Sequence, residues 1–206
     1  MVLTFDDAFV DFHTTAMPIL AEFGFPATLY VPSAFVGRTS RWLEQEGEGT
    51  RPIMSWSALQ EAVQAGIEVG SHSRTHADLD LVDKNRLRAE VVDSKAELEE
   101  HLQAPVSSFA YPFGHNNAAV RSQLVGAGYT SGVAVRDLAS DNESPYRLSR
   151  WTVPGDMSAS VLAALLGRRT GRLATLRSDA HALVSTALRR TGLKRHADAA
   201  DHEIDQ

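Results

Sequence analysis

The chain has 206 residues, 43% of them hydrophobic, which is enough to bury one sizeable core without a second folding unit. The net charge of −6 argues against a nucleic-acid binder, because Lys and Arg are spread thinly over most of the chain. Cysteine is absent, which excludes disulfides, thiolate metal sites and a cysteine nucleophile, so any metal must be held by His and carboxylate side chains.

The start of the chain carries no targeting segment that we recognise. It opens on an apolar stretch without a basic region, and no apolar run approaches the length of a membrane span. We therefore expect a cytoplasmic protein without a membrane span. A strand that starts at residue 2 is unusual for an intact domain, which leaves the alternative that an upstream segment has been lost.

Two adjacent carboxylates, Asp6 and Asp7, follow a predicted strand over residues 2–5. Neighbouring side chains at a strand end point different ways, so one carboxylate can hold a cation while the other takes up a proton. The alternative is a turn or a helix cap, both of which Asp favours.

The next two elements form a βαβ unit. Residues 9–24 have helical spacing, with Pro18 placing the regular part from about residues 14–15 onward and Gly24 as the expected C-cap. Residues 27–31 are a β-rich run that is closed by a proline. A strand, a helix and a second strand in this order are typical of a parallel sheet.

Residues 33–54 show no periodicity and are predicted to form a long loop. Within it, Trp42 either lines a sugar-binding cleft or packs locally.

A helix over 57–65 leads to a strand over 67–71, and two imidazoles, His72 and His76, follow that strand. Two His and one Asp would leave a fourth tetrahedral position for water, as in a catalytic zinc site. For Ser71 and Thr75, support of the ligands and a plain loop role are equally open.

Residues 87–102 are predicted to form a strongly amphipathic helix whose charges are a solvated face and nothing more. The remaining predicted elements are strands over 106–111, 129–135 and 147–153 and helices over 117–126 and 158–166. The alternation predicts an α/β fold, a distorted barrel of about seven parallel strands or an open sheet, with ligand groups at the carboxyl ends of strands.

Composition divides the chain into a unit that holds the candidate ligand groups, residues 1–167, and a basic amphipathic helix with a frayed tail, residues 168–206. Such a helix can pack on its own domain, or meet a membrane surface or a partner.

Three ordered motifs resemble those of the polysaccharide deacetylases, carbohydrate esterase family 4, also known as the NodB homology domain. They are residues 4–7 (TFDD), 71–76 (SHSRTH) and 109–114 (FAYPFG), and the resemblance covers residues 2 to about 153. It implies a TIM-barrel-like (β/α) fold and one divalent metal, most often zinc, with cobalt, nickel or manganese as alternatives.

The resemblance also implies roles for individual residues. Asp7, His72 and His76 would hold the metal, and Asp6 would be the general base. A backbone N–H near Phe113 would help to stabilise the oxyanion. The remaining implied substrate contacts are Tyr111, Pro112 and, from the loop above, Trp42.

The chain departs from the family pattern at several positions. Ala8 replaces a usual glycine, so we expect the turn after Asp7 to avoid positive φ. Ala110 replaces an arginine that orients the catalytic Asp, and Arg150 either fills that role or is an ordinary rim charge.

The late motif that supplies the usual general acid is missing. His115 and His181 are the weak candidates that remain for this role.

The function we expect is metal-dependent removal of N-acetyl groups from an acetylated sugar, with activated water as the nucleophile. One alternative is a catalytically weak carbohydrate-binding or regulatory relative. The other is a hydrolase of a non-sugar C–N bond.

Overall fold

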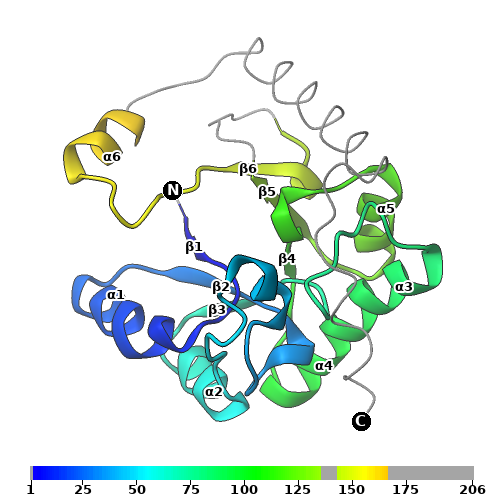
Figure 1. Ribbon diagram of the computed structural model, residues 1–206, viewed down its shortest axis with the longest axis horizontal. Helices are drawn as coiled ribbons and strands as arrows, with labels where there is room; N and C mark the ends of the chain where they lie inside the picture. The colour runs from blue at the N-terminus through cyan, green and yellow to red at the C-terminus, as the bar shows by residue number, and fades with distance from the viewer. Residues whose placement is uncertain (1, 136–142, 167–206) are drawn as a thin grey trace.

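The computed structural model describes residues 2–135 and 143–166. Its centre is a parallel sheet of six strands in sequential order. The strands are β1 (Leu3–Phe5), β2 (Ala27–Val31), β3 (Glu68–Ser71), β4 (Ser108–Ala110), β5 (Ser131–Val135) and β6 (Leu148–Arg150). The helices α1 to α5 follow one another around the outside of these strands (Figure 1). The predicted α/β barrel of parallel strands is therefore confirmed.

The sheet is an open half-barrel, because β1 and β6 are its two ends and do not pair with each other in the described residues. It has six strands in this part of the chain rather than about seven, since the sequence holds six β-rich runs and none follows β6 in the described range. Arg150 reaches across the opening, where its Nη1 donates to Thr4 Oγ1 at 3.1 Å. A side chain thus links two strands that no backbone ladder joins.

The helical elements are α1 (Met17–Phe23), α2 (Trp56–Gln64), α3 (Lys84–Arg88), α4 (Ser94–Leu102), α5 (Ala118–Gly126) and α6 (Ala159–Leu166). Two π-helical turns, η1 (Phe12–Ala16) and η4 (Ala89–Asp93), precede α1 and join α3 to α4. The short 3₁₀ turns are η2 (Ser33–Phe35), η3 (Arg41–Glu46), η5 (Pro112–Gly114) and η6 (Pro145–Arg147). The long helix predicted over 87–102 therefore begins earlier, at Lys84, and contains a π turn.

Capping residues set the helix ends. Gly24 ends α1 with φ of 65°, as predicted, because glycine adopts this left-handed conformation without a Cβ clash. Asp83 begins α3 by accepting from the backbone N–H groups of Asn85 and Arg86, which explains the earlier start of that helix. No helix among the described residues combines the length and apolar character needed to cross a bilayer.

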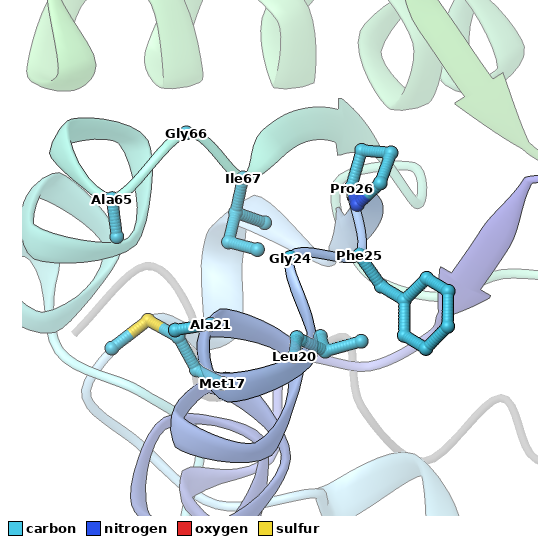
Figure 2. A pocket seen from close by; sticks show the side chains of 9 residues that line it. All are labelled: Met17, Leu20, Ala21, Gly24, Phe25, Pro26, Ala65, Gly66 and Ile67. Atoms are coloured by element: carbon cyan, nitrogen blue, oxygen red, sulfur yellow. The ribbon is translucent and has the colours of Figure 1, made fainter.

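The strands are held in a core that is buried on both faces of the sheet. All five residues of β2 are buried, as expected for a central parallel strand covered by helices. At the amino ends of β2 and β3 an apolar pocket opens, lined by Met17, Leu20, Ala21, Gly24, Phe25, Pro26, Ala65, Gly66 and Ile67 (Figure 2). The predicted catalytic residues follow the carboxyl ends of the strands, so this pocket is not part of their site.

The basic helix and tail predicted over 168–206 lie outside the described residues, as does His181. Their roles stay predictions.

Close packing against β3 gives a test of the fold. A Cβ added at Gly70 would lie 2.4 Å from Tyr30 Cε1, so we expect Gly70→Ala to lower the free energy of unfolding by about 1–3 kcal/mol. The matched control is Gly126→Ala in α5, where no heavy atom lies within 4 Å of the added Cβ. There we expect a gain of up to about 1 kcal/mol, because alanine loses less chain entropy than glycine on folding. Urea unfolding checks both values, and equal stability of the two variants would contradict the packing described.

Candidate functional site

The candidate site lies at the carboxyl ends of β1 and β3, on either side of β2. Asp6 and Asp7 follow β1, and His72 follows β3, where its N–H donates to Val31 O of β2 at 2.9 Å. Parallel strands end at one edge of the sheet, so residues from distant parts of the sequence meet there. This arrangement confirms that the two predicted motifs are neighbours in space.

Asp7, His72 and His76 form a cluster that could hold one cation. One potential ligand atom from each side chain lies within 4.8 Å of the others. Asp7 Oδ1 is 3.3 Å from His76 Nε2 and 3.6 Å from His72 Nε2. Asp7 Oδ1 is buried and has no hydrogen-bond partner in the described residues. Because a buried polar atom without a partner is costly, this oxygen between two imidazole nitrogens fits a divalent cation.

The His72 ring is held in the tautomer that a metal ligand needs. Its Nδ1 is 2.9 Å from the carbonyl oxygen of Ala110, which can only accept, so Nδ1 carries the proton. The Nε2 lone pair therefore faces the carboxylates. Burial lowers the pKa of His72 and His76 lowers it further, while the carboxylates of Asp6 and Asp7 raise it, and the net pKa lies below the usual value.

The His76 ring lies between aromatic side chains, and its buried Nδ1 has no hydrogen-bond partner in the described residues. It stacks on Trp42 with ring centroids 4.8 Å apart, and it meets Phe113 edge to face at 4.8 Å. Trp42 itself packs on Phe35. The loop predicted over 33–54 thus supports a predicted metal ligand.

Arg150 forms a bidentate ion pair with Asp6, in which Nη1 donates to Oδ1 at 2.6 Å and Nη2 donates to Oδ2 at 2.7 Å. Of the two alternatives for Arg150, the structure thus favours contact with the predicted base over a rim charge. Burial raises the pKa of the Asp6 carboxyl, but His72 and Arg150 lower it by more, so its pKa lies below the usual value. The carboxylate is therefore ionised at neutral pH.

Asp7 is ionised for a related reason. Burial raises the pKa of its carboxyl, but the two imidazoles of His76 and His72 outweigh burial and the repulsion from Asp6, so the net pKa is lowered. The two adjacent carboxylates thus have different partners, an arginine for one and two imidazoles for the other.

The turn after Asp7 contradicts one expectation. Asp7 has φ of 73° and Ala8 has φ of 54°, so the turn is left-handed although neither residue is glycine. Ala8 is fully buried in the core, and this packing holds a conformation that alanine disfavours. Ser73, His76 and Phe113 also have positive φ, which places five of the six such non-glycine residues of the described chain around the site.

The three predicted substrate contacts are buried. Tyr111 is fully buried, its hydroxyl donates to Tyr146 O at 2.7 Å, and burial raises the pKa of its phenol. Pro112 is buried in η5, and Trp42 is 7% exposed behind His76. Trp42 packs on His76 and Tyr111 lies in the hydrophobic core, so the structure does not favour direct contact of these side chains with a sugar.

His115, a weak candidate for the general acid, has a buried partner. Its Nδ1 is 2.5 Å from Asp78 Oδ1, and its ring centroid is 5.7 Å from that of Phe113. Asp78, Asp80 and His115 form a second group with ligand atoms within 4.8 Å. Because Asp78 already pairs with His115, we assign no ion to this group.

Sequence reasoning missed two acids of the long helix, Glu90 and Glu97. Both bind the loop that holds His72 and His76, so the interpretation of the helix charges as a solvated face is wrong at these positions. In the sequence, Glu90 lies between Leu87 and Val91, which are both buried. This position beside the apolar face of the helix could have indicated that Glu90 is buried as well.

Solved structures share the fold. The Streptococcus pyogenes deacetylase PplD in complex with acetate has a TM-score of 0.69 and 26% identity, over 81% of this chain and 70% of that one. IcaB from Ammonifex degensii has a TM-score of 0.65 and 27% identity, over 81% and 72% of the two chains. A carbohydrate esterase family 4 pseudoenzyme from Bacillus anthracis, BA3943, has 21% identity and a TM-score of 0.50, over 64% and 42%, which shows the fold alone.

A curated relative is similar in sequence. YxkH of Bacillus subtilis (strain 168), whose name assigns it to the polysaccharide deacetylases, is 26% identical over 167 residues. The alignment covers 81% of this chain, which spans 56% of the length of YxkH. The family model for polysaccharide deacetylases matches residues 1–132, more than half of the chain and both halves of the Asp and His cluster. The chain therefore belongs to the polysaccharide deacetylase family.

Proposed function

We propose that this protein is a metal-dependent hydrolase that removes N-acetyl groups from carbohydrate. The observation that supports it most directly is the cluster of Asp7, His72 and His76 beside an ionised Asp6. Membership of the family and the acetate bound in the related PplD agree with amide hydrolysis that releases acetate. Zinc is the proposed metal, and the cytoplasmic location stays a prediction.

The residues present fit a single divalent cation held by Asp7, His72 and His76. Such a cation, when bound, lowers the pKa of water and polarises an acyl oxygen. We call these three side chains the metal cage, and neighbouring residues hold two of them in place. The carbonyl of Ala110 orients His72, and Trp42 and Phe113 hold the ring of His76.

Hydrolysis joins a water oxygen to the acetyl carbon and breaks the carbon–nitrogen bond, which gives acetate and a free amine. Asp6 takes up the proton that the attacking water loses. Arg150 uses one lone pair on each Asp6 oxygen, and each oxygen keeps a second one to accept that proton. The backbone N–H of Phe113 is the proposed donor to the oxyanion.

The amine must gain a proton as it leaves, and His115, held by Asp78, is the candidate donor on the described chain. A relative without turnover is the alternative, because the late acid motif is missing from the sequence and a pseudoenzyme shares this fold.

The metal cage is tested by titrating zinc into metal-free protein. We expect one equivalent to bind, and we expect His76→Ala to weaken binding by more than about 100-fold, the upper end of what outer-shell partners contribute. His13→Ala is the matched control, because His13 pairs with Glu61 on the surface and should leave zinc affinity unchanged. Equal affinity of His76→Ala and wild type would rule out the cage.

The base is tested by acetate release from chitooligosaccharides and N-acetylhexosamines. Asp6→Asn should bind zinc as wild type does but release acetate about 100- to 10,000-fold more slowly, because it cannot accept the proton. Asp11→Asn, on the exposed surface, is the control. Equal rates for Asp6→Asn and wild type would refute the mechanism. Sugar binding without acetate release would favour a non-catalytic relative, and turnover of a sugar-free amide alone would favour a different C–N bond.

Arg150 is tested by a double-mutant cycle with Asp6. Arg150→Lys keeps the charge but loses the bidentate contact, so we expect kcat to fall by up to about 100-fold through misplacement of the base. In the Asp6→Asn background the same change should have little further effect, because both changes act on one step. Additive losses would show that Arg150 acts independently of Asp6.

A further inference from the structure

The described chain holds a buried acid that takes no direct part in the proposed reaction. Glu90 lies in the π-helical turn η4, between α3 and α4, and is 2% exposed. A buried carboxylate is costly unless it is paired and hydrogen-bonded. Its partners therefore indicate what it does.

Glu90 accepts three hydrogen bonds from the loop between the two predicted histidine ligands. Oε2 accepts from the backbone N–H of Arg74 at 2.9 Å and of Thr75 at 2.7 Å. Oε1 accepts from the Thr75 hydroxyl at 2.5 Å, and Arg86 Nε lies 3.8 Å away. Both oxygens are thus engaged, mainly by the backbone and side chain of residues 74–75.

The same loop adopts backbone conformations that need such support. Ser73 has φ of 63° and His76 has φ of 58°, and neither is glycine. Within the loop, the Ser73 hydroxyl accepts from the His76 N–H at 3.0 Å. Left-handed residues of this kind persist only where the surroundings hold them, and Glu90 bonds the two residues that lie between them.

A second acid in the helix that follows, Glu97 of α4, also binds the loop. Glu97 Oε1 accepts from Arg74 Nε at 2.8 Å, and Glu97 Oε2 accepts from the Ser33 hydroxyl. Both acids bind Arg74, Glu90 through the backbone N–H and Glu97 through the guanidinium. Ala34 N–H also donates to Arg74 O at 3.0 Å, which ties η2 to the loop.

We propose that Glu90 is a positioning residue that sets the spacing and direction of His72 and His76 for the cation. This inference rests on the proposed function, since it needs the two imidazoles to be ligands. If Glu90 acted only on the stability of the fold, any substitution in η4 that lowers stability by the same amount would weaken metal binding equally. The positioning role predicts an effect that depends on the loop contacts.

The test compares zinc affinity and the absorption spectrum of cobalt-substituted protein in three variants of the full chain. Glu90→Ala removes all the loop contacts, and we expect zinc affinity to fall by about 10- to 100-fold, as for other outer-shell partners of metal ligands. The visible cobalt bands should also change, because they report the ligand geometry. Glu90→Gln should restore most of the affinity, since its amide oxygen can still accept from both backbone N–H groups.

The matched control is Val91→Ala in the same π turn. Val91 is fully buried in the core, so its truncation lowers stability, and the structure gives its side chain no bond to residues 73–76. We expect wild-type zinc affinity and wild-type cobalt bands for it. If Glu90→Ala fails to fold, Thr75→Val takes its place, because it removes the hydroxyl bond to Glu90 and the 3.5 Å contact of that hydroxyl with Arg86 Nη2, but keeps both backbone N–H bonds to Glu90. It should weaken zinc binding by up to about 10-fold.

Wild-type zinc affinity in Glu90→Ala, or in Thr75→Val when that variant replaces it, would overturn the inference. Equal losses in Glu90→Ala and Val91→Ala would also overturn it, because they would show a role in stability only. In both cases zinc binding by wild type would leave the proposed function standing. Failure of wild type itself to bind zinc or cobalt would overturn the proposed metal dependence and, with it, the role of Glu90.

Discussion

The site depends on one buried oxygen, Asp7 Oδ1, which lies within 3.6 Å of an Nε2 atom from each of two imidazoles. It has no hydrogen-bond partner among the described residues. Asp7 follows β1 and the imidazoles follow β3, so the contact spans the intervening strand β2. The ends of parallel strands bring these residues near one another. Asp7 and His76 both have a left-handed backbone, and their side chains approach to 3.3 Å.

Two neighbouring carboxylates, Asp6 and Asp7, have different surroundings. Arg150 holds both oxygens of Asp6, while Asp7 faces imidazoles. The charges around each carboxyl outweigh the effect of burial on its pKa, so both carboxylates are ionised although their partners differ. The proposed division between a base and a ligand therefore follows from environment rather than from residue type, which is the same for both.

Neighbouring residues hold each predicted histidine ligand and the loop between them. Trp42 and Phe113 hold the His76 ring, Ala110 orients His72, and Glu90 holds the loop between them. A shared fold does not by itself imply a function, and a protein described as a pseudoenzyme shares this fold. In this family, activity therefore has to be argued from the side chains around the cation site rather than from the half-barrel.

The sequence by itself determined the parallel α/β architecture, the ends of most helices and the residues of the cluster that could hold a cation, because these follow from local patterns and from ordered motifs. Only the tertiary structure decided that Ala8 is left-handed, that Glu90 is buried against residues 74–75, and that Tyr111 lies in the core. It also shows that Arg150 pairs with Asp6, a carboxylate 144 residues away. Periodicity shows which face of an element is apolar, but contacts across the sheet depend on how the elements pack, and no local pattern encodes that.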